Sequence, residues 1–328
     1  MPDILKFIRI KNLLFIAFIQ LVVQYTVITP LMQKYGFDIS TNYLCVVLLI
    51  LATVLIAAGG YILNDYFDVK IDVINKPNDV IVTRSVTKQK AMLLHQILTG
   101  LGAVAGLMLA WINKSFTLAF VFIVVPGMLW FYSASYKRQF LIGNLIVALL
   151  AGLSVFVVAI NQIAILHHEY SNLIYETPIP GDIYGWVGGL AVFSFLTTLI
   201  REIVKDIEDI EGDREMECRT LPVKWGIQAT KKILYVLIVI EVLLLYFVNF
   251  ECIPFEGSLT LKYIIWGLTL PFIYLVYLLF KADDSAGFAS ASRLLKFIMI
   301  IGICYGFVFY YLMAKTYGLS LFNLFIVK

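Results

Sequence analysis

Two short segments of the chain carry three aspartates each at the same spacing. They are NDYFDVKID, with Asp65, Asp68 and Asp72, and KDIEDIEGD, with Asp206, Asp209 and Asp213. The i, i+3, i+7 spacing confines three side chains to roughly 60° of arc on an α-helix. We therefore expect each trio to line one helix face.

Like charges on one helix face repel each other, so a positive charge must offset them. Mg²⁺ suits this role because proteins hold it with one or two carboxylates together with phosphate oxygens and water. Two such faces across a cavity predict a diphosphate site bridged by about two Mg²⁺ ions. The nearby cations that would neutralise the remaining diphosphate charge are Arg84, Lys137, Arg201 and Lys205. Asn64 is either an amide that positions a ligand or an ordinary helix-end residue.

The elements that position these residues must cross a membrane. The chain of 328 residues is 61% hydrophobic and 14% charged, with a mean hydropathy of +0.90. Stretches long enough to span a hydrocarbon core of ~30 Å occur at residues 12–32, 43–63, 91–112, 115–135, 140–166, 183–200, 233–250, 261–280 and 294–314. We expect one all-α polytopic domain over residues 1–328, with about nine transmembrane helices around a central cavity.

The basic residues predict how these helices are oriented. Twenty of the 25 Lys and Arg residues fall on one side if the N-terminus is cytoplasmic, which places the C-terminus outside. Both acidic loops, residues 64–90 and 201–232, then face the cytoplasm and hold twelve of the 22 carboxylates. The protein is thus expected in the inner or cell membrane, among membrane lipids. Its net charge of +3 comes from the cytoplasmic loops and does not indicate nucleic-acid binding.

Two features inside the predicted spans lie outside this constellation. Glu241 is a lone acid in an apolar stretch, so it is either functional, paired with a neighbour, or extended towards the interface. Gly100, Gly102 and Gly106 have the small-residue spacing that lets helices pack closely, which we favour over a dinucleotide loop.

The two motifs and their surroundings resemble the UbiA superfamily of intramembrane prenyltransferases. NDYFDVKID followed by DVINKP, and REIVKDIEDIEGDRE followed by RTLPVKWG, are similar to the paired aspartate-rich motifs of that family. The resemblance implies that Asn64 and all six aspartates belong to these motifs and that Tyr132 and Lys137 fall in the matching segment after the fourth span. Within the superfamily, EIVKDIEDIEGD, RTLPVKWG and IGNLIVALLAG look most like the digeranylgeranylglyceryl phosphate synthases.

The resemblance implies an enzyme that ionises an allylic prenyl diphosphate and passes the prenyl group to an acceptor. The expected donor is geranylgeranyl diphosphate and the expected acceptor is geranylgeranylglyceryl phosphate. An aromatic quinone precursor such as 4-hydroxybenzoate, homogentisate or a naphthoate is the near alternative. After the first motif the family implies a stretch like INRPxRPIPSG, whereas this chain has INKPNDVIVTRSV, with Lys76 and Asp79 among the changes and Arg84 as a replacement charge.

Two other classes are less consistent with the pattern. A cation transporter would carry its acids near the membrane midplane, whereas these cluster at one membrane face. A CDP-alcohol phosphotransferase would need a DG pair followed by AR in one motif, which the sequence lacks.

Overall fold

The structure, a computed structural model, describes residues 3–37, 42–75, 77, 80–322 and 324–326. Its α-helices are α1 (Asp3–Phe7), α2 (Ile10–Val22), α3 (Thr29–Lys34), α4 (Tyr43–Asn75), α5 (Lys88–Ile112), α6 (Phe116–Ala134), α7 (Ile142–Tyr170), α8 (Ile179–Glu208), α9 (Ile210–Glu215), α10 (Leu221–Trp225), α11 (Ile227–Phe247), α12 (Leu259–Tyr263), α13 (Leu270–Lys281) and α14 (Ser285–Tyr317). The other elements are the π-helical η1 (Val23–Ile28), η5 (Val248–Cys252) and η6 (Ile264–Thr269), the 3-10 helices η3 (Tyr136–Arg138) and η4 (Ser171–Glu176), and the antiparallel strands β1 (Ser320–Leu321) and β2 (Phe325–Ile326).

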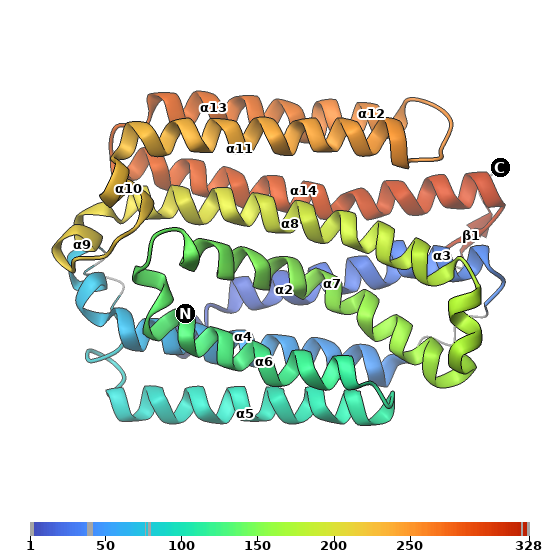
Figure 1. Cartoon of the computed structure of the whole chain (residues 1–328), viewed down its shortest axis with the longest axis horizontal. Helices are drawn as coiled ribbons and strands as arrows, with labels where there is room; N and C mark the ends of the chain where they lie inside the picture. The colour runs from blue at the N-terminus through green and yellow to red at the C-terminus, as the bar shows by residue number, and fades with distance from the viewer. Residues whose placement is uncertain (1–2, 38–41, 76, 78–79, 323, 327–328) are drawn as a thin grey trace.

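Within the described residues, nine helical stretches are long and apolar enough to cross a membrane. This confirms the expected all-α membrane class. Helices satisfy their own backbone hydrogen bonds, which is what a chain surrounded by hydrocarbon requires. Figure 1 shows them side by side in a bundle, with α9 and α10 at one end and the C-terminus at the other. Large apolar side chains such as Trp111 and Phe116 are 85% and 83% exposed, as lipid-facing residues are.

Small residues bring α4 and α5 close together. A Cβ on Gly102 would lie 2.9 Å from the Ile56 nitrogen of α4, and one on Gly106 would overlap the Phe122 ring of α6. A Cβ on Gly100 would meet nothing within 4 Å. The packing interpretation therefore holds for two of these three glycines.

The two aspartate segments differ in shape. α4 continues to Asn75, beyond the span predicted to end at residue 63, and carries the first trio on one continuous helix. The second trio does not lie on one helix, because α8 ends at Glu208 and α9 begins at Ile210. The prediction of one helix face is therefore wrong for the second trio. Asp206 lies on α8, Asp209 at the break and Asp213 on α9.

The Asn75 side chain binds the backbone at this break. Its Nδ2 donates to the Asp209 carbonyl at 3.0 Å, and its Oδ1 accepts from the Gly212 N–H at 2.8 Å. A Cβ on Gly212 would lie 2.6 Å from Asn75 Nδ2, so only glycine fits without a shift. This contact, called here the Asn75 clamp, joins the end of the first motif to the second.

Candidate active site

A cavity of about 950 Å³ lies among α2, α4, α6, α7, α8 and α14. Its apolar part is lined by residues such as Ile19, Ile56, Phe122, Leu129 and Val157. Its polar part carries both acids and cations, and these are Arg9, Lys11, Asp72, Lys137, Arg138, Arg201, Glu202, Lys205, Asp206, Asp209, Asp213 and Lys296. The cavity can therefore hold a molecule with a charged head and a hydrocarbon tail.

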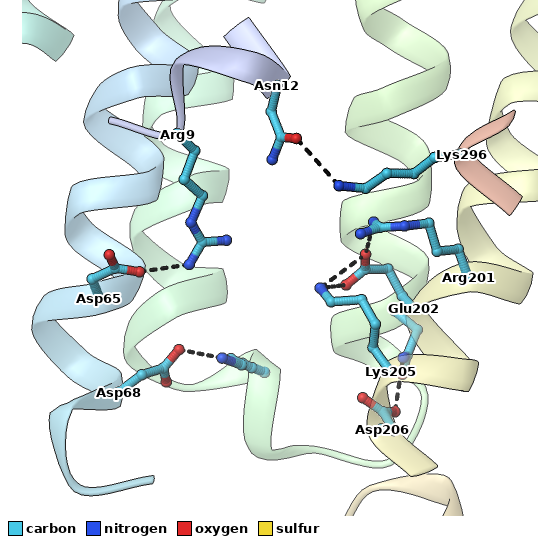
Figure 2. A network of polar contacts seen from close by, with 11 residues as sticks. Arg9, Asn12, Asp65, Asp68, Arg201, Glu202, Lys205, Asp206 and Lys296 are labelled. Atoms are coloured by element: carbon cyan, nitrogen blue, oxygen red, sulfur yellow. Dashed lines mark hydrogen bonds and ion pairs between the residues drawn. The ribbon is translucent and has the colours of Figure 1, made fainter. Parts of the chain in front are cut away.

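Cations form ion pairs with Asp65 and Asp68, the first two aspartates of the first trio (Figure 2). Arg9 donates to Asp65 at 2.6 Å, and Lys137 donates to Asp68, whose side chain is 5% exposed. Burial lowers the pKa of Lys137, but Asp68, Tyr132 and Asp72 together raise it by more, so the net shift is upward and the ammonium keeps its charge. Asp72 lines the cavity directly. Asp65 and Asp68 reach the cavity through Arg9 and Lys137, which are part of its lining.

The second trio lies on the α8 and α9 side of the same cavity. Asn144 at the start of α7 donates to Asp206 at 2.8 Å, and the Thr220 hydroxyl donates to Asp213 at 3.1 Å. Burial raises the pKa of Asp213 to about 6, although Lys137 and Thr220 act in the opposite direction. Asp72 and the second trio thus line one cavity, although the second trio is not on a single helix face.

The donor set fits Mg²⁺ shared with a substrate better than a closed protein site. Among the described residues, no three His, Cys, Asp or Glu side chains form a group that could hold one ion. Mg²⁺ does not need such a group, because it binds through one or two carboxylates together with substrate phosphates and water. Asn64 Oδ1 is buried beside the cavity without a hydrogen-bond partner, which leaves an oxygen available for a ligand.

The remaining predicted residues divide into two groups. Tyr132, Arg201 and Lys205 line the cavity. Arg84 does not: it is exposed on the turn between Val82 and Val86 and is absent from the described lining. Lys76 and Asp79 lie outside the described residues.

Several site residues were not selected from the sequence. Arg9 and Asn12 belong to a basic N-terminal segment that we used only for orientation, yet both line the cavity. Asn144 lies in the first turn of α7, after the basic pair at residues 137–138, and Lys296 lies near the predicted start of the last span. The sequence counted Lys296 only as a charge on the cytoplasmic side, so no local pattern marked it as a site residue.

Glu241 is not part of this cavity lining. It is 1% exposed on α11 and accepts a hydrogen bond from the Thr197 hydroxyl of α8 at 2.5 Å. Of the possibilities left open, the structure selects the pairing one. Glu241 connects two helices inside the bundle and does not extend to the membrane surface.

The fold and cavity define a polytopic membrane protein with an internal site that is apolar at one end and charged at the other. The sequence profile of the UbiA prenyltransferase family matches residues 26–301. A digeranylgeranylglyceryl phosphate synthase from Sulfurisphaera tokodaii is 33% identical over 257 residues, covering 76% of this chain and 85% of the relative. One from Sulfolobus acidocaldarius is 30% identical over 291 residues, covering 87% and 94%.

Solved structures agree on the fold. One from work on digeranylgeranylglyceryl phosphate synthase in membranes superposes with a TM-score of 0.63 at 25% identity, covering 94% of this chain and 97% of the other. A UbiA homolog from Archaeoglobus fulgidus bound to GPP and Mg²⁺ has a TM-score of 0.58 at 16% identity, covering 94% and 99%.

The chain therefore belongs to the UbiA prenyltransferase family. It is an integral membrane enzyme that transfers prenyl groups. Membership in an enzyme family removes the transporter alternative.

Proposed function

We propose that this enzyme transfers a geranylgeranyl group from geranylgeranyl diphosphate to the free hydroxyl of geranylgeranylglyceryl phosphate and releases diphosphate. The observation that carries the proposal is the single cavity in which aspartates of both motifs meet above an apolar compartment. The choice of acceptor rests on the relatives named digeranylgeranylglyceryl phosphate synthase, two of which are 30% and 33% identical over most of this chain.

The charged residues would have two roles, binding Mg²⁺ and neutralising the diphosphate. Asp72, Asp206, Asp209 and Asp213 would hold about two Mg²⁺ ions together with the diphosphate, with Asp65 and Asp68 supporting them through Arg9 and Lys137. When bound, Mg²⁺ would neutralise the charge that develops on the departing diphosphate. Lys137 is a fixed cation that lines the cavity, and the uncharged polar groups of Asn64 and Tyr132 line it as well and would face the diphosphate.

The reaction balances without a further reactant. The allylic C–O bond of the donor breaks and its electron pair leaves with the diphosphate. A C–O ether bond then forms between the prenyl carbon and the acceptor oxygen, and the hydroxyl proton is released. The apolar lining around Phe122 and Leu129 excludes water, which would otherwise capture the allylic cation. We place the active-site loops and the N-terminus in the cytoplasm, because most basic residues lie on the same side of the membrane as these loops. The C-terminus is then outside.

The test is transfer by the purified protein in detergent. Labelled geranylgeranyl diphosphate and Mg²⁺ are incubated with geranylgeranylglyceryl phosphate, 4-hydroxybenzoate, homogentisate or a naphthoate. We expect metal-dependent transfer to the glycerol phosphate, lost in Asp68→Asn and Asp206→Asn. Asp283→Asn, an exposed acid in the turn before α14, is the matched control and should resemble the wild type.

Two results would contradict the proposal at different points. Transfer to an aromatic acceptor alone would keep the mechanism and show that the acceptor is wrong. Equal activity of the wild type and both aspartate variants would show that these carboxylates do not hold the diphosphate.

A further inference from the structure

Three cations lie together on one side of the cavity. They are Arg201 and Lys205 of α8 and Lys296 of α14, and all three line the cavity. Figure 2 shows them around Glu202, with Asn12 of α2 opposite Lys296. We call these three residues the cationic cluster.

The cationic cluster carries more positive charge than the protein neutralises. Glu202 accepts from Arg201 at 2.9 Å and from Lys205 at 3.0 Å. Lys296 donates to Asn12 Oδ1 at 3.5 Å, and no carboxylate of the described residues forms an ion pair with it. Among the described residues, Glu202 is the one carboxylate within ion-pair distance of the three cations, which leaves two positive charges in excess of it. Arg201 and Lys205 are partly buried and Lys296 lines the cavity with an exposed side chain, so this excess favours an anionic ligand in the cavity.

Two further observations point to a ligand. Arg201 Nε is buried and has no hydrogen-bond partner, which leaves a donor available in the cluster. Lys296 lies near the predicted start of the last span at residue 294, and its exposed side chain lines the cavity. Its ammonium can therefore donate to a phosphate that enters the cavity.

The cationic cluster begins beside the proposed diphosphate ligands, because Lys205 directly precedes Asp206, and extends away from them through Arg201 and Lys296. On α8, Arg201 precedes Asp206 by five residues, which is ~7.5 Å along the axis towards the middle of the bundle. Lys296 comes from α14, which carries no residue of either aspartate motif. Lys137, not the cationic cluster, pairs with an aspartate of the first motif. The cavity thus offers two positions for anions, one at the aspartates and one at the cationic cluster.

We propose that the cationic cluster binds the phosphomonoester of the acceptor and thereby selects a phosphorylated glycerol lipid over an uncharged one. The inference rests on the proposed function. A phosphomonoester carries about −1.5 to −2 charges at neutral pH, which matches the surplus. The proposal also assigns Arg201 and Lys205 to the acceptor, whereas the sequence analysis had assigned them to the donor diphosphate.

The experiment measures the KM of each substrate separately. Lys296→Met is the informative variant because Lys296 has no carboxylate partner, so its loss leaves no unpaired acid behind. We expect its KM for geranylgeranylglyceryl phosphate to rise ~10- to 100-fold, as for loss of one charged contact, while the KM for geranylgeranyl diphosphate stays within about twofold. Lys296→Arg should recover most of the loss.

A matched control lies on the same helix. Arg293 is exposed on α14, donates to Ser290 at 2.9 Å and is not in the described cavity lining, so Arg293→Met should leave both KM values unchanged. Geranylgeranylglycerol, which lacks the phosphate, is compared with the phosphorylated acceptor. The wild type should strongly prefer the phosphorylated compound, and Lys296→Met should lose most of that preference.

The outcomes separate the inference from the proposed function. If the wild type does not prenylate geranylgeranylglyceryl phosphate, the proposed function fails, and the inference fails with it, before any variant is measured. If the wild type uses that acceptor but Lys296→Met raises only the donor KM, the cationic cluster belongs to the diphosphate site. If neither KM changes, Lys296 contacts neither substrate. Each of the last two results overturns the inference alone.

Discussion

The Asn75 clamp gives the sharpest test of how the two motifs are held in register. Asn75 is the last residue of α4, and its amide binds both the Asp209 carbonyl and the Gly212 N–H. These backbone groups lie at the break between α8 and α9, beside Asp209 and Asp213. Moving the amide should therefore move two of the proposed metal ligands.

Gly212→Ala is the perturbation. Its Cβ would lie 2.6–2.7 Å from three atoms of the Asn75 amide, which is closer than real contacts allow, so the amide must leave. Two hydrogen bonds are lost at about 1 kcal/mol each, and a buried polar group left unpaired adds about 1 kcal/mol more. If the whole of this loss, about 2 to 3 kcal/mol, raises the free energy of the transition state relative to free enzyme and substrates, kcat/KM falls ~30- to 150-fold. The Mg²⁺ concentration for half-maximal rate should rise as well.

The control is Gly189→Ala on α8, where an added Cβ meets nothing within 4 Å. Prenyl transfer and its Mg²⁺ dependence are measured for Gly212→Ala, Gly189→Ala, Asn75→Ala and the double variant at positions 75 and 212. The double variant should be no worse than Asn75→Ala, because the added methyl no longer meets an amide. The reasoning is refuted if Gly212→Ala behaves like Gly189→Ala, or if the two losses simply add.

Three further predictions follow from the site and the orientation. Lys137→Met should raise the KM for the prenyl diphosphate ~10- to 100-fold because Asp68 loses its cation, while Lys137→Arg should retain most activity; equal KM values in steady-state assays would contradict this. Protons compete with Mg²⁺ for Asp213, whose pKa is raised to about 6, so apparent Mg²⁺ affinity should fall as the pH drops through that value. Asp213→Asn should remove that inflection, and an unchanged titration would exclude Asp213 as a ligand. A membrane-impermeant maleimide should label exposed Cys252 in intact cells, and labelling only after lysis would reverse the proposed orientation.

The sequence was sufficient for the fold class because membrane insertion depends on local composition. Each span is recognised within about 20 residues, and the part of the chain that the structure describes holds nine such helices where about nine were expected. The aspartate motifs were found for the same reason, since their spacing repeats within a few helical turns. The break at Asp209 was missed, and the side chain that binds its backbone, Asn75, lies 134 positions earlier in the chain.

Only the tertiary structure decided which polar group each cation contacts. Arg9 and Asp65 are 56 positions apart, Lys137 and Asp68 are 69 apart, and Lys296 and the Asn12 amide are 284 apart. Arg84 is close in sequence to the first motif, yet it lies on an exposed turn outside the described lining of the cavity. Residue type and local spacing determined that this protein spans a membrane and carries a metal-diphosphate pattern. The arrangement of charges around the substrates depends on how distant helices pack, because side chains interact over a few ångströms of space whatever their separation along the chain.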